Sequence, residues 1–517
     1  MNARYALAAM FTAFACDQAM AQAGSLDISF GTNGIVTAQP GDFHDVGYDI
    51  LALPDNTTLV CGVARHGGRN AIFITHRLED GSPDVAFGPD QGYTFFNIGE
   101  EAYGYAMGRD SQGRIYVAGL AYPSFSQSVV VLVRTDANGI PDASYGNFGA
   151  LDLPIGTHDA EAKALVVLPN DDVLLAGSVV GNDFVRDAMI VRITSAGSVD
   201  PGFGVNGYAI ADGMTGESLL NDIATLEDGS IVGVGYTDVS FVQKTFVMKT
   251  DASGSPVATF GTNGLLLPTL PATDHSAWGV IASGTNLLLT GTMTVGAESD
   301  IYVGRIMEDA TYDPSFNSGA PLMIDLLDHE VGFDLVENSG QIYVCGTTGV
   351  PGFGSPRDFF IAKLNDAGVV NAAFGAGGST VTSVQADFDD ANALCMQPDG
   401  KLVAAGFTAG FSTGGDNDVA MVRYLDDGTT DIAFQAASAA TLYPTPAIGN
   451  TVTVITACTG KVTCRILDAA GRQVSNATTG NGSSTLQLDI ATLVAGRYVV
   501  LITDGILAER HALVIAP

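Results

Sequence analysis

The sequence contains few charged residues, very few basic ones and, after its first residues, no long apolar segment. Charged residues make up 15% of the 517 positions and hydrophobic residues 46%, which excludes a disordered chain and a coiled coil. The 22 Lys and Arg residues stand against 56 Asp and Glu residues, so the formal net charge is −34 and disfavours nucleic acid as a partner. No later segment offers about 18 consecutive uncharged apolar residues, which argues against a membrane-spanning helix. The acidity fits either a soluble extracellular surface or cation binding.

Motifs of several enzyme and metal-site classes are also absent from the sequence. The seven histidines show no His-x-x-x-His spacing and the six cysteines no Cys-x-x-Cys pair, so a zinc site has no local support. No phosphate-binding loop is present either. We therefore predict no catalytic residue and no metal ligand, and the binding residues stay unassigned.

The N-terminus has the three parts of a secretory signal. Arg4 lies in a short basic region, residues 5–15 are apolar, and Ala21-Gln22-Ala23 offers a cleavage site of small residues. We expect residues 1–23 to be a signal peptide. Cys16 offers an alternative as a lipoprotein cysteine, although the bulky side chain two positions before it fits that pattern badly.

A repeat of about 58 residues runs through most of the chain. Each repeat contains four short apolar or alternating runs separated by turn residues, as in a four-stranded antiparallel meander, and helical periodicity is not found. Seven repeats lie between eight aromatic markers, most of them followed by Gly: Phe30, Phe87, Tyr145, Phe203, Phe260, Phe316, Phe374 and Phe434. The pattern predicts an all-β fold, a seven-bladed β-propeller of four-stranded antiparallel blades over residues 24–440.

The two ends of the repeat region predict how the propeller closes. No strands precede the first marker, but Gly34-Ile35-Val36 follows it, whereas the last marker is followed by the strand-poor run 435–440. We therefore expect an N-terminal strand at residues 34–38 to complete the last blade. A linear array would need caps, and none is visible.

Three segments carry a resemblance to a known repeat family. Leu26 to Gly34, Pro398 to Gly406 and Ala420 to Tyr424 resemble the delta-60 repeat family. That resemblance implies a β-propeller and, since the family has no assigned activity, leaves the function open.

A basic residue closes one strand of every repeat, and most repeats carry an acid or amide three positions before the aromatic marker. The basic residues are Arg77, Arg134, Arg192, Lys249, Arg305, Lys363 and Arg423. They form either a ring of charge aimed at a ligand or a clamp that fixes each turn. Repetition favours the clamp, and it favours a role for the aromatic markers as wedges between blades.

The periodicity stops after Tyr443-Pro444-Thr445-Pro446, and residues 441–517 alternate differently, as in a small immunoglobulin-like β-sandwich. The segment resembles the type A sorting domain of the type IX secretion system, through that motif, residues 467–472, residues 493–498 and the terminal strand 512–515. The resemblance implies the secretion machinery as a partner, and a location outside the cell or on its outer surface. An ordinary accessory domain is the alternative.

The cysteines and the acidic residues allow two further predictions. Cys61, Cys345 and Cys395 read as small buried residues, whereas Cys458 and Cys464 flank a turn of the C-terminal module and are a candidate disulfide. Carboxylates gather ahead of the second runs and form either a solvated acidic rim or a calcium site, the one cofactor that the sequence allows: Asp45, Glu100, Glu101, Asp159, Glu161, Asp274, Asp328, Glu330, Asp387, Asp389 and Asp390.

Three functions agree with these observations. We rank first a secreted or cell-surface binding or adhesion protein for an extracellular glycan or protein. A structural surface component comes second, and an extracellular polymer-degrading hydrolase or lyase last, because clustered catalytic side chains are not evident. The residues that differ between repeats, such as Trp278, are the place to look for a site.

Overall fold

The computed structural model describes two compact units, Met1–Gly428 and Thr429–Pro517. The described residues are 22–124, 127–211, 216–296, 298–326, 329–349, 356–385, 387–410 and 416–426 of the first unit, and 441–443, 450–455, 463–467, 473–478, 485–491, 493–494, 496–503 and 508–515 of the second. The predicted signal peptide lies almost wholly outside these residues. The predicted boundary at residue 440 follows a segment that is also outside them.

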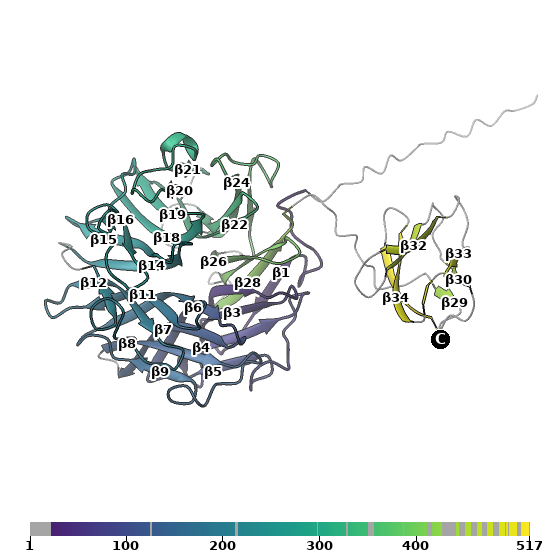
Figure 1. Cartoon of the computed structure of the whole chain (residues 1–517), viewed down its shortest axis with the longest axis horizontal. Helices are drawn as coiled ribbons and strands as arrows, with labels where there is room; N and C mark the ends of the chain where they lie inside the picture. The colour runs from purple at the N-terminus through teal and green to yellow at the C-terminus, as the bar shows by residue number, and fades with distance from the viewer. Residues whose placement is uncertain are drawn as a thin grey trace, which may run out of the picture. The chain divides into compact units, whose positions relative to one another are not determined.

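The first unit consists of antiparallel strands, with one short 3-10 turn, η1 (Asn317–Gly319), among its described residues. Five sheets of four strands follow one another round a common axis (Figure 1). Their strands are β2 (Val46–Ala52), β3 (Thr58–His66), β4 (Arg69–Arg77) and β5 (Tyr93–Phe96); β6 (Glu101–Arg109), β7 (Ile115–Ser124), β8 (Gln127–Thr135) and β9 (Ala150–Leu153); β10 (Ala160–Val167), β11 (Val173–Val180), β12 (Arg186–Ile193) and β13 (Tyr208–Ile210); β14 (Ser218–Thr225), β15 (Ile231–Val239), β16 (Val242–Thr250) and β17 (Leu265–Leu266); β18 (Asp274–Ser283), β19 (Asn286–Val295), β20 (Glu298–Ile306) and β21 (Leu322–Ile324). The predicted all-β fold of four-stranded antiparallel blades is confirmed.

The remaining strands of this unit form one eight-stranded assembly in which two groups are joined by a single parallel pair, Arg357 with Phe388. The strands are β22 (His329–Asn338), β23 (Gln341–Gly349), β24 (Arg357–Asn365) and β25 (Ser379–Thr382), then β26 (Phe388–Met396), β27 (Leu402–Ala409), β28 (Asn417–Tyr424) and the N-terminal β1 (Ile35–Ala38). In Figure 1 the purple β1 lies beside the green β28, and Ile35 is paired with Val422. The expected strand at residues 34–38 therefore lies at the edge of the last repeat.

In the first unit, the first strand of each group of four contains a β-bulge at the same position. We call these seven strands the inner strands: β2, β6, β10, β14, β18, β22 and β26. In β6 the register shifts between Gly104 and Ala106, so Tyr105 is the extra residue. Gly104 faces Gly119 on the neighbouring β7, where an added Cβ would lie 1.8 Å from the carbonyl oxygen of Tyr103. A glycine is therefore required opposite the bulge. The same glycine recurs at Gly62, Gly177, Gly235, Gly291, Gly346 and Gly406.

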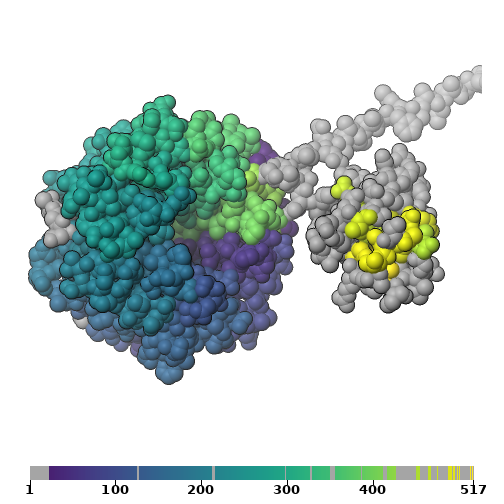
Figure 2. All heavy atoms as spheres, in the orientation of Figure 1, coloured from purple at the N-terminus to yellow at the C-terminus, as the bar shows by residue number. Residues whose placement is uncertain are grey.

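Apolar side chains fill the space between neighbouring sheets. One cluster joins the first repeat to the last, with Ile50, Val60 and Phe73 packed against Val403 and Met421. Figure 2 shows the purple N-terminal atoms directly against the green atoms of the last strands. The described aromatic markers are all buried, from Phe30 to Phe374, as expected for wedges between sheets.

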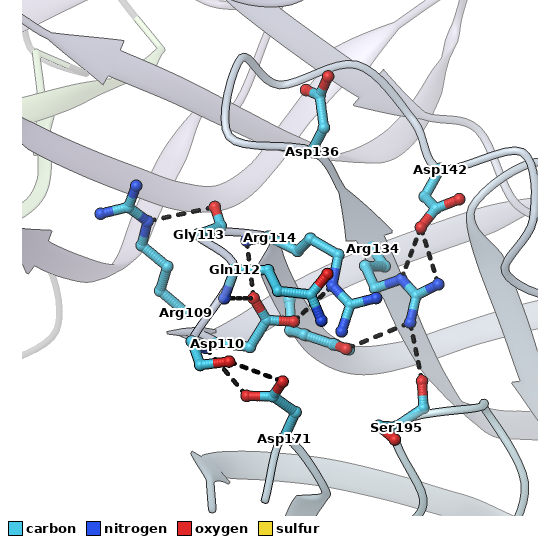
Figure 3. Close-up of polar contacts among 12 residues, drawn as sticks. Arg109, Asp110, Gln112, Gly113, Arg114, Arg134, Asp136, Asp142, Asp171 and Ser195 are labelled. Carbon is cyan, nitrogen blue, oxygen red and sulfur yellow. Dashed lines mark hydrogen bonds and ion pairs between the residues drawn. The ribbon is translucent and has the colours of Figure 1, made fainter. Parts of the chain in front are cut away.

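Four of the repeated arginines, Arg134, Arg192, Arg305 and Arg423, act as clamps that reach the next repeat, and Figure 3 shows the first of them. The guanidinium group of Arg134 contacts Asp142 of its own turn at 2.7 Å and donates to the carbonyl oxygen of Ser195 in the next repeat at 2.9 Å. It also lies 3.9 Å from the ring centre of Tyr145. Equivalent ion pairs are Arg192–Asp200, Arg305–Asp313 and Arg423–Asp27. In the first repeat His76 contacts Asp84 instead, at 3.0 Å.

The described residues of the second unit form seven strands in two sheets. One sheet is β29 (Thr441–Tyr443), β30 (Thr451–Ile455) and β33 (Thr485–Asp489), and the other is β32 (Gln473–Thr478), β31 (Thr463–Leu467), β34 (Gly496–Thr503) and β35 (Ala508–Ile515). Val454, Ile466, Leu488, Val500 and Leu513 pack into one core. No helix among the described residues of either unit has the length and apolar character to cross a membrane.

Candidate ligand-binding site at the inner strands

All seven bulge residues line one cavity of about 140 Å³. Because the bulge re-aims one side chain of each inner strand, it brings seven positions of different repeats to one place. These residues share a position but no chemistry: Tyr48, Tyr105, Lys163, Asn221, Trp278, Phe333 and Asn392. Each of the seven is half-buried. We refer to this space as the central cavity.

Aromatic rings form two groups in the wall of the central cavity. The rings of Tyr48 and Tyr105 meet edge to face with centres 5.1 Å apart, and the ammonium group of Lys163 lies 3.8 Å from the centre of the Tyr105 ring. Trp278 and Phe333 meet edge to face at 5.7 Å. Burial raises the pKa of Tyr48, so its hydroxyl stays protonated at neutral pH. The wall therefore offers apolar ring faces together with hydroxyl groups and one cation.

Three aspartates, Asp49, Asp222 and Asp334, also line the central cavity and join neighbouring sheets. Asp49 accepts hydrogen bonds from the backbone N–H groups of Ile50, at 2.7 Å, and of Met107 on the adjacent inner strand, at 2.6 Å. The other two make the same pair of bonds, to Ile223 and Val280 and to Leu335 and Leu394.

Burial is the main cause of the raised pKa of each of these aspartates, and for Asp49 and Asp222 repulsion by another aspartate adds to it. It raises the pKa of Asp49 to about 7 and that of Asp334 to about 6. The pKa of Asp222 lies well above its ordinary value for the same reason. Sequence reasoning missed these residues. The available signal was an aspartate before Ile or Leu at one position of three repeats, as in Asp49-Ile50, which only an alignment of the repeats on their shared glycines makes visible.

A second group of polar side chains lies toward the N-terminal ends of β6 and β10. The hydroxyl of Tyr103 donates to Glu101 at 2.8 Å and accepts from the Asn70 amide at 2.7 Å. Glu161 on β10 pairs with Arg186 on β12 and with Lys163, at 3.2 Å.

Two further tyrosines belong to this group. The charges of Glu161 and Arg186 act on the pKa of both Tyr122 and Tyr236. Burial, and then the bond to Glu101, raises the pKa of Tyr103 to about 12. We call Glu101, Tyr103, Tyr122, Glu161, Arg186 and Tyr236 the mouth cluster. Two of its members, Tyr103 on β6 and Glu161 on β10, lie two positions before the cavity residues Tyr105 and Lys163.

Most carboxylates of the predicted acidic rim accept hydrogen bonds from nearby backbone groups or form ion pairs, and they do not meet at a shared site. Asp45 accepts from the backbone of Gly41 at 2.8 Å, and Asp159 from Ser128 at 2.7 Å. Asp389 accepts from Val384 at 2.6 Å, and burial raises its pKa to about 6. Asp390 pairs with Arg357, and Glu100 with Arg69. Glu101 and Glu161 are the members of the predicted rim that the structure brings into the mouth cluster, whereas Asp328 lies outside the described residues.

One group of carboxylates has a geometry that suits a cation. Single oxygens of Asp300, Asp325 and Glu330 lie within 4.8 Å of one another. Glu330 is buried and accepts a hydrogen bond from Thr348 at 3.1 Å. Calcium binding stays a prediction. Titration calorimetry of the protein with calcium tests it, and an absence of heat together with an unchanged melting temperature would exclude it.

The predicted small cysteines Cys61, Cys345 and Cys395 are buried in strands of the first unit. In the second unit Cys464 is buried in β31, whereas Cys458 lies outside the described residues. Their disulfide stays a prediction.

Two family models match the chain. The model described as "Domain of unknown function (DUF5122) beta-propeller" matches residues 111–145 and 397–434, and the model described as "Secretion system C-terminal sorting domain" matches residues 441–516. These matches indicate a β-propeller and a type IX sorting domain within the chain. Both predicted resemblances are thereby confirmed. The sorting domain indicates export by type IX secretion to the cell surface or outside the cell, with the secretion machinery as its partner.

Solved structures that align with this chain have little sequence in common with it. The polysaccharide lyase Uly1 is 11% identical with a TM-score of 0.41, over 74% of this chain and 90% of its own. Sqt1 from Chaetomium thermophilum, bound to the N-terminus of the ribosomal protein L10, is 13% identical with a TM-score of 0.35, over 92% and 100%. An ulvan lyase of family PL25 is 12% identical with a TM-score of 0.32, over 86% and 96%. Among curated protein sequences none matches the chain.

Proposed function

We propose that the exported propeller is an extracellular binding protein that receives its ligand at the central cavity and the mouth cluster. One observation carries the proposal. The residues that repeat around the propeller are clamps, wedges and bulge glycines, whereas the seven bulge residues differ from one another and yet line one cavity. Side chains that build the fold are expected to recur, and side chains that recognise an asymmetric ligand are expected to differ.

The chemistry of the two groups suits a small polar ligand with apolar faces. Trp278 and Tyr105 offer ring faces, Lys163 offers a cation, and Glu101 and Glu161 offer hydrogen-bond acceptors. Sites of this kind combine aromatic walls with a few polar groups that set the orientation of the ligand. A cavity of about 140 Å³ admits one sugar ring or one side chain rather than a folded domain. A glycan or the end of a peptide is therefore the ligand class that we propose.

Glycan-array screening of the full exported chain, followed by calorimetry, tests the proposal. We expect Trp278→Ala to weaken binding by about tenfold or more, because a central aromatic contact contributes on the order of 2 kcal/mol. Phe148→Ala is the matched control, since Phe148 is an exposed aromatic residue at the opposite end of the sheets. Equal affinities of the wild type and Trp278→Ala would contradict the proposed site.

Two other functions remain less favoured. A structural surface component would self-associate and would bind its ligands no differently when Trp278 is replaced. A hydrolase or lyase acting on extracellular polymers needs free acid and base groups, whereas Asp49, Asp222 and Asp334 each accept two backbone N–H groups. Release of new reducing ends from a polymer incubated with the protein would favour the enzyme over the binding protein.

A further inference from the structure

Two neighbouring hairpins present a phenylalanine to solvent at their tips. Phe184 lies in the turn between β11 and β12 and is 73% exposed, and Phe241 lies in the turn between β15 and β16 and is fully exposed. Each hairpin joins the second and third strands of its sheet, and the two sheets are consecutive in the chain and packed together through a common core. Neither ring contributes to a core, so both ring faces are accessible to a ligand.

Both hairpins lie at the end of the sheets that carries the mouth cluster. The ring of His158, two residues before β10, meets the Phe184 ring edge to face at 4.6 Å. Arg186 is the first residue after the Phe184 turn and pairs with Glu161 of the mouth cluster. In the next sheet the backbone N–H of Asp238, close to the Phe241 turn, donates to Glu217 just before β14. The two phenylalanines therefore share one face of the propeller with the proposed site.

The backbone at both phenylalanines favours glycine. Phe184 has a φ of 63°, and Ser240 and Phe241 have φ values of 56° and 67° between the paired residues Val239 and Val242. A two-residue hairpin turn with both φ values positive prefers Asn-Gly or Gly-Gly, and a bulky residue there is strained. In the first repeat the equivalent turn is Gly67-Gly68. The chain thus holds a phenylalanine, fully exposed, where glycine is the favoured residue.

We propose that Phe184 and Phe241 form an aromatic platform that binds a neutral polysaccharide running toward the mouth cluster, an inference that rests on the proposed function. Apolar C–H faces of sugar rings stack on isolated aromatic rings, and the carboxylate, hydroxyl and guanidinium groups of Glu161, Tyr236 and Arg186 suit their hydroxyl groups. The net charge of −34 disfavours an anionic polymer. A protein partner would need a contiguous apolar centre, whereas these rings lie singly among polar residues such as Asp183.

Binding of the full exported chain to insoluble cellulose, chitin and xylan, with alginate as an anionic probe, tests the platform. We expect the wild type to bind at least one neutral polymer and the double variant F184G/F241G to bind it about tenfold or more weakly. Because glycine relieves the strained turns, the double variant should melt at the same temperature as the wild type or higher, so unfolding cannot explain the loss. F148A is the control, since Phe148 is 77% exposed with a φ of 51° but precedes β9 at the opposite end.

The outcomes separate this inference from the proposed function. Unchanged binding of F184G/F241G together with weakened binding of W278A overturns the platform and leaves the proposed function intact. Unchanged binding of both variants overturns both. Binding of alginate alone, or of none of the four polymers, overturns the assignment to a neutral polysaccharide, and so does capture of a protein that depends on the two phenylalanines.

Discussion

At the scale of residues, the half-buried Asp49, Asp222 and Asp334 show how the inner strands combine structure with chemistry. Each carboxylate joins two neighbouring sheets through backbone N–H donors, yet each is buried enough that its charged form is disfavoured. Burial and mutual repulsion act against the hydrogen bonds, and for Asp49 they prevail, because its pKa is about 7 rather than 3.8. The protonation of the central cavity therefore changes close to neutral pH.

The stability of the propeller is expected to depend on pH through Asp49. A carboxyl group whose pKa is raised by folding binds its proton more tightly in the folded state, so the free energy of unfolding falls as pH rises from about 4 to about 7. One such group contributes a slope of at most about 1.4 kcal/mol per pH unit. Asp49→Asn should reduce this slope, although loss of one backbone hydrogen bond lowers stability at every pH.

Urea denaturation at pH 5, 6, 7 and 8 measures this slope. Asp55→Asn is the control, because Asp55 lies in an exposed turn and a hydrogen bond from Thr57 lowers its pKa. Its replacement should leave the slope above pH 5 unchanged. The same slope for wild type and Asp49→Asn would show that Asp49 does not titrate in this range.

At the scale of elements, the bulge of each inner strand is the feature that creates the site. It occurs in all seven inner strands and is always opposite a glycine, such as Gly119. A Cβ at Gly119 would lie 1.8 Å from the Tyr103 carbonyl oxygen and 2.8 Å from its carbonyl carbon, so a backbone atom would have to move.

Gly119→Ala should therefore lower the free energy of unfolding by about 3 kcal/mol or more, as expected for a clash that the backbone cannot relieve. It should also weaken ligand binding, since Tyr105 is the bulged residue and Tyr103 lies two positions before it. The control is Gly304→Ala, whose added Cβ would meet only the Tyr312 side chain, at 3.2 Å. Thermal and urea denaturation of both variants measure the difference, and a small loss at Gly119 would contradict the requirement for glycine.

The sequence predicted the strands, their grouping into four-stranded sheets and the position of β1, because the apolar periodicity and the turn residues repeat. Of the site, it pointed to Trp278 as a residue that differs between repeats, and to Glu101 and Glu161 as members of an acidic rim. It did not predict the other bulge residues, such as Tyr105 and Lys163, because they have no common property and no periodic signal marks them. The pair of Glu161 with Arg186 and the edge-to-face contact of His158 with Phe184 depend on side-chain packing that does not repeat. Positions that differ between repeats carry no periodic signal, so the sequence alone does not indicate what their side chains contact.

At the scale of the whole molecule, the proposed binding site and the export signal belong to different units. The sorting domain has its own core, with Val454 and Leu513 among its buried residues, and the propeller has separate cores between its sheets. A chain that lacks residues 441–517 should therefore keep the melting temperature of the propeller and fail to cross the outer membrane.

Immunoblots of the medium, the cell surface and the periplasm measure this localisation in a cell that has type IX secretion. The truncated chain should accumulate in the periplasm, and a secreted reporter fused to residues 441–517 should leave the cell. Arrival of the truncated chain at the surface in the amount of the full chain would show that export does not need the sorting domain.

The contact between β1 and β28 also has a kinetic consequence. The ion pair of Asp27 with Arg423 next to these strands joins residues 396 positions apart. Closing a loop of that length is entropically less favourable than closing one within a repeat by roughly 2 kcal/mol, since each doubling of length adds about 0.6 kcal/mol. Such distant contacts form slowly. The last sheet is therefore expected to assemble late, because β28 is synthesised last, and β1 and the edge of β28 stay unpaired until the two strands meet.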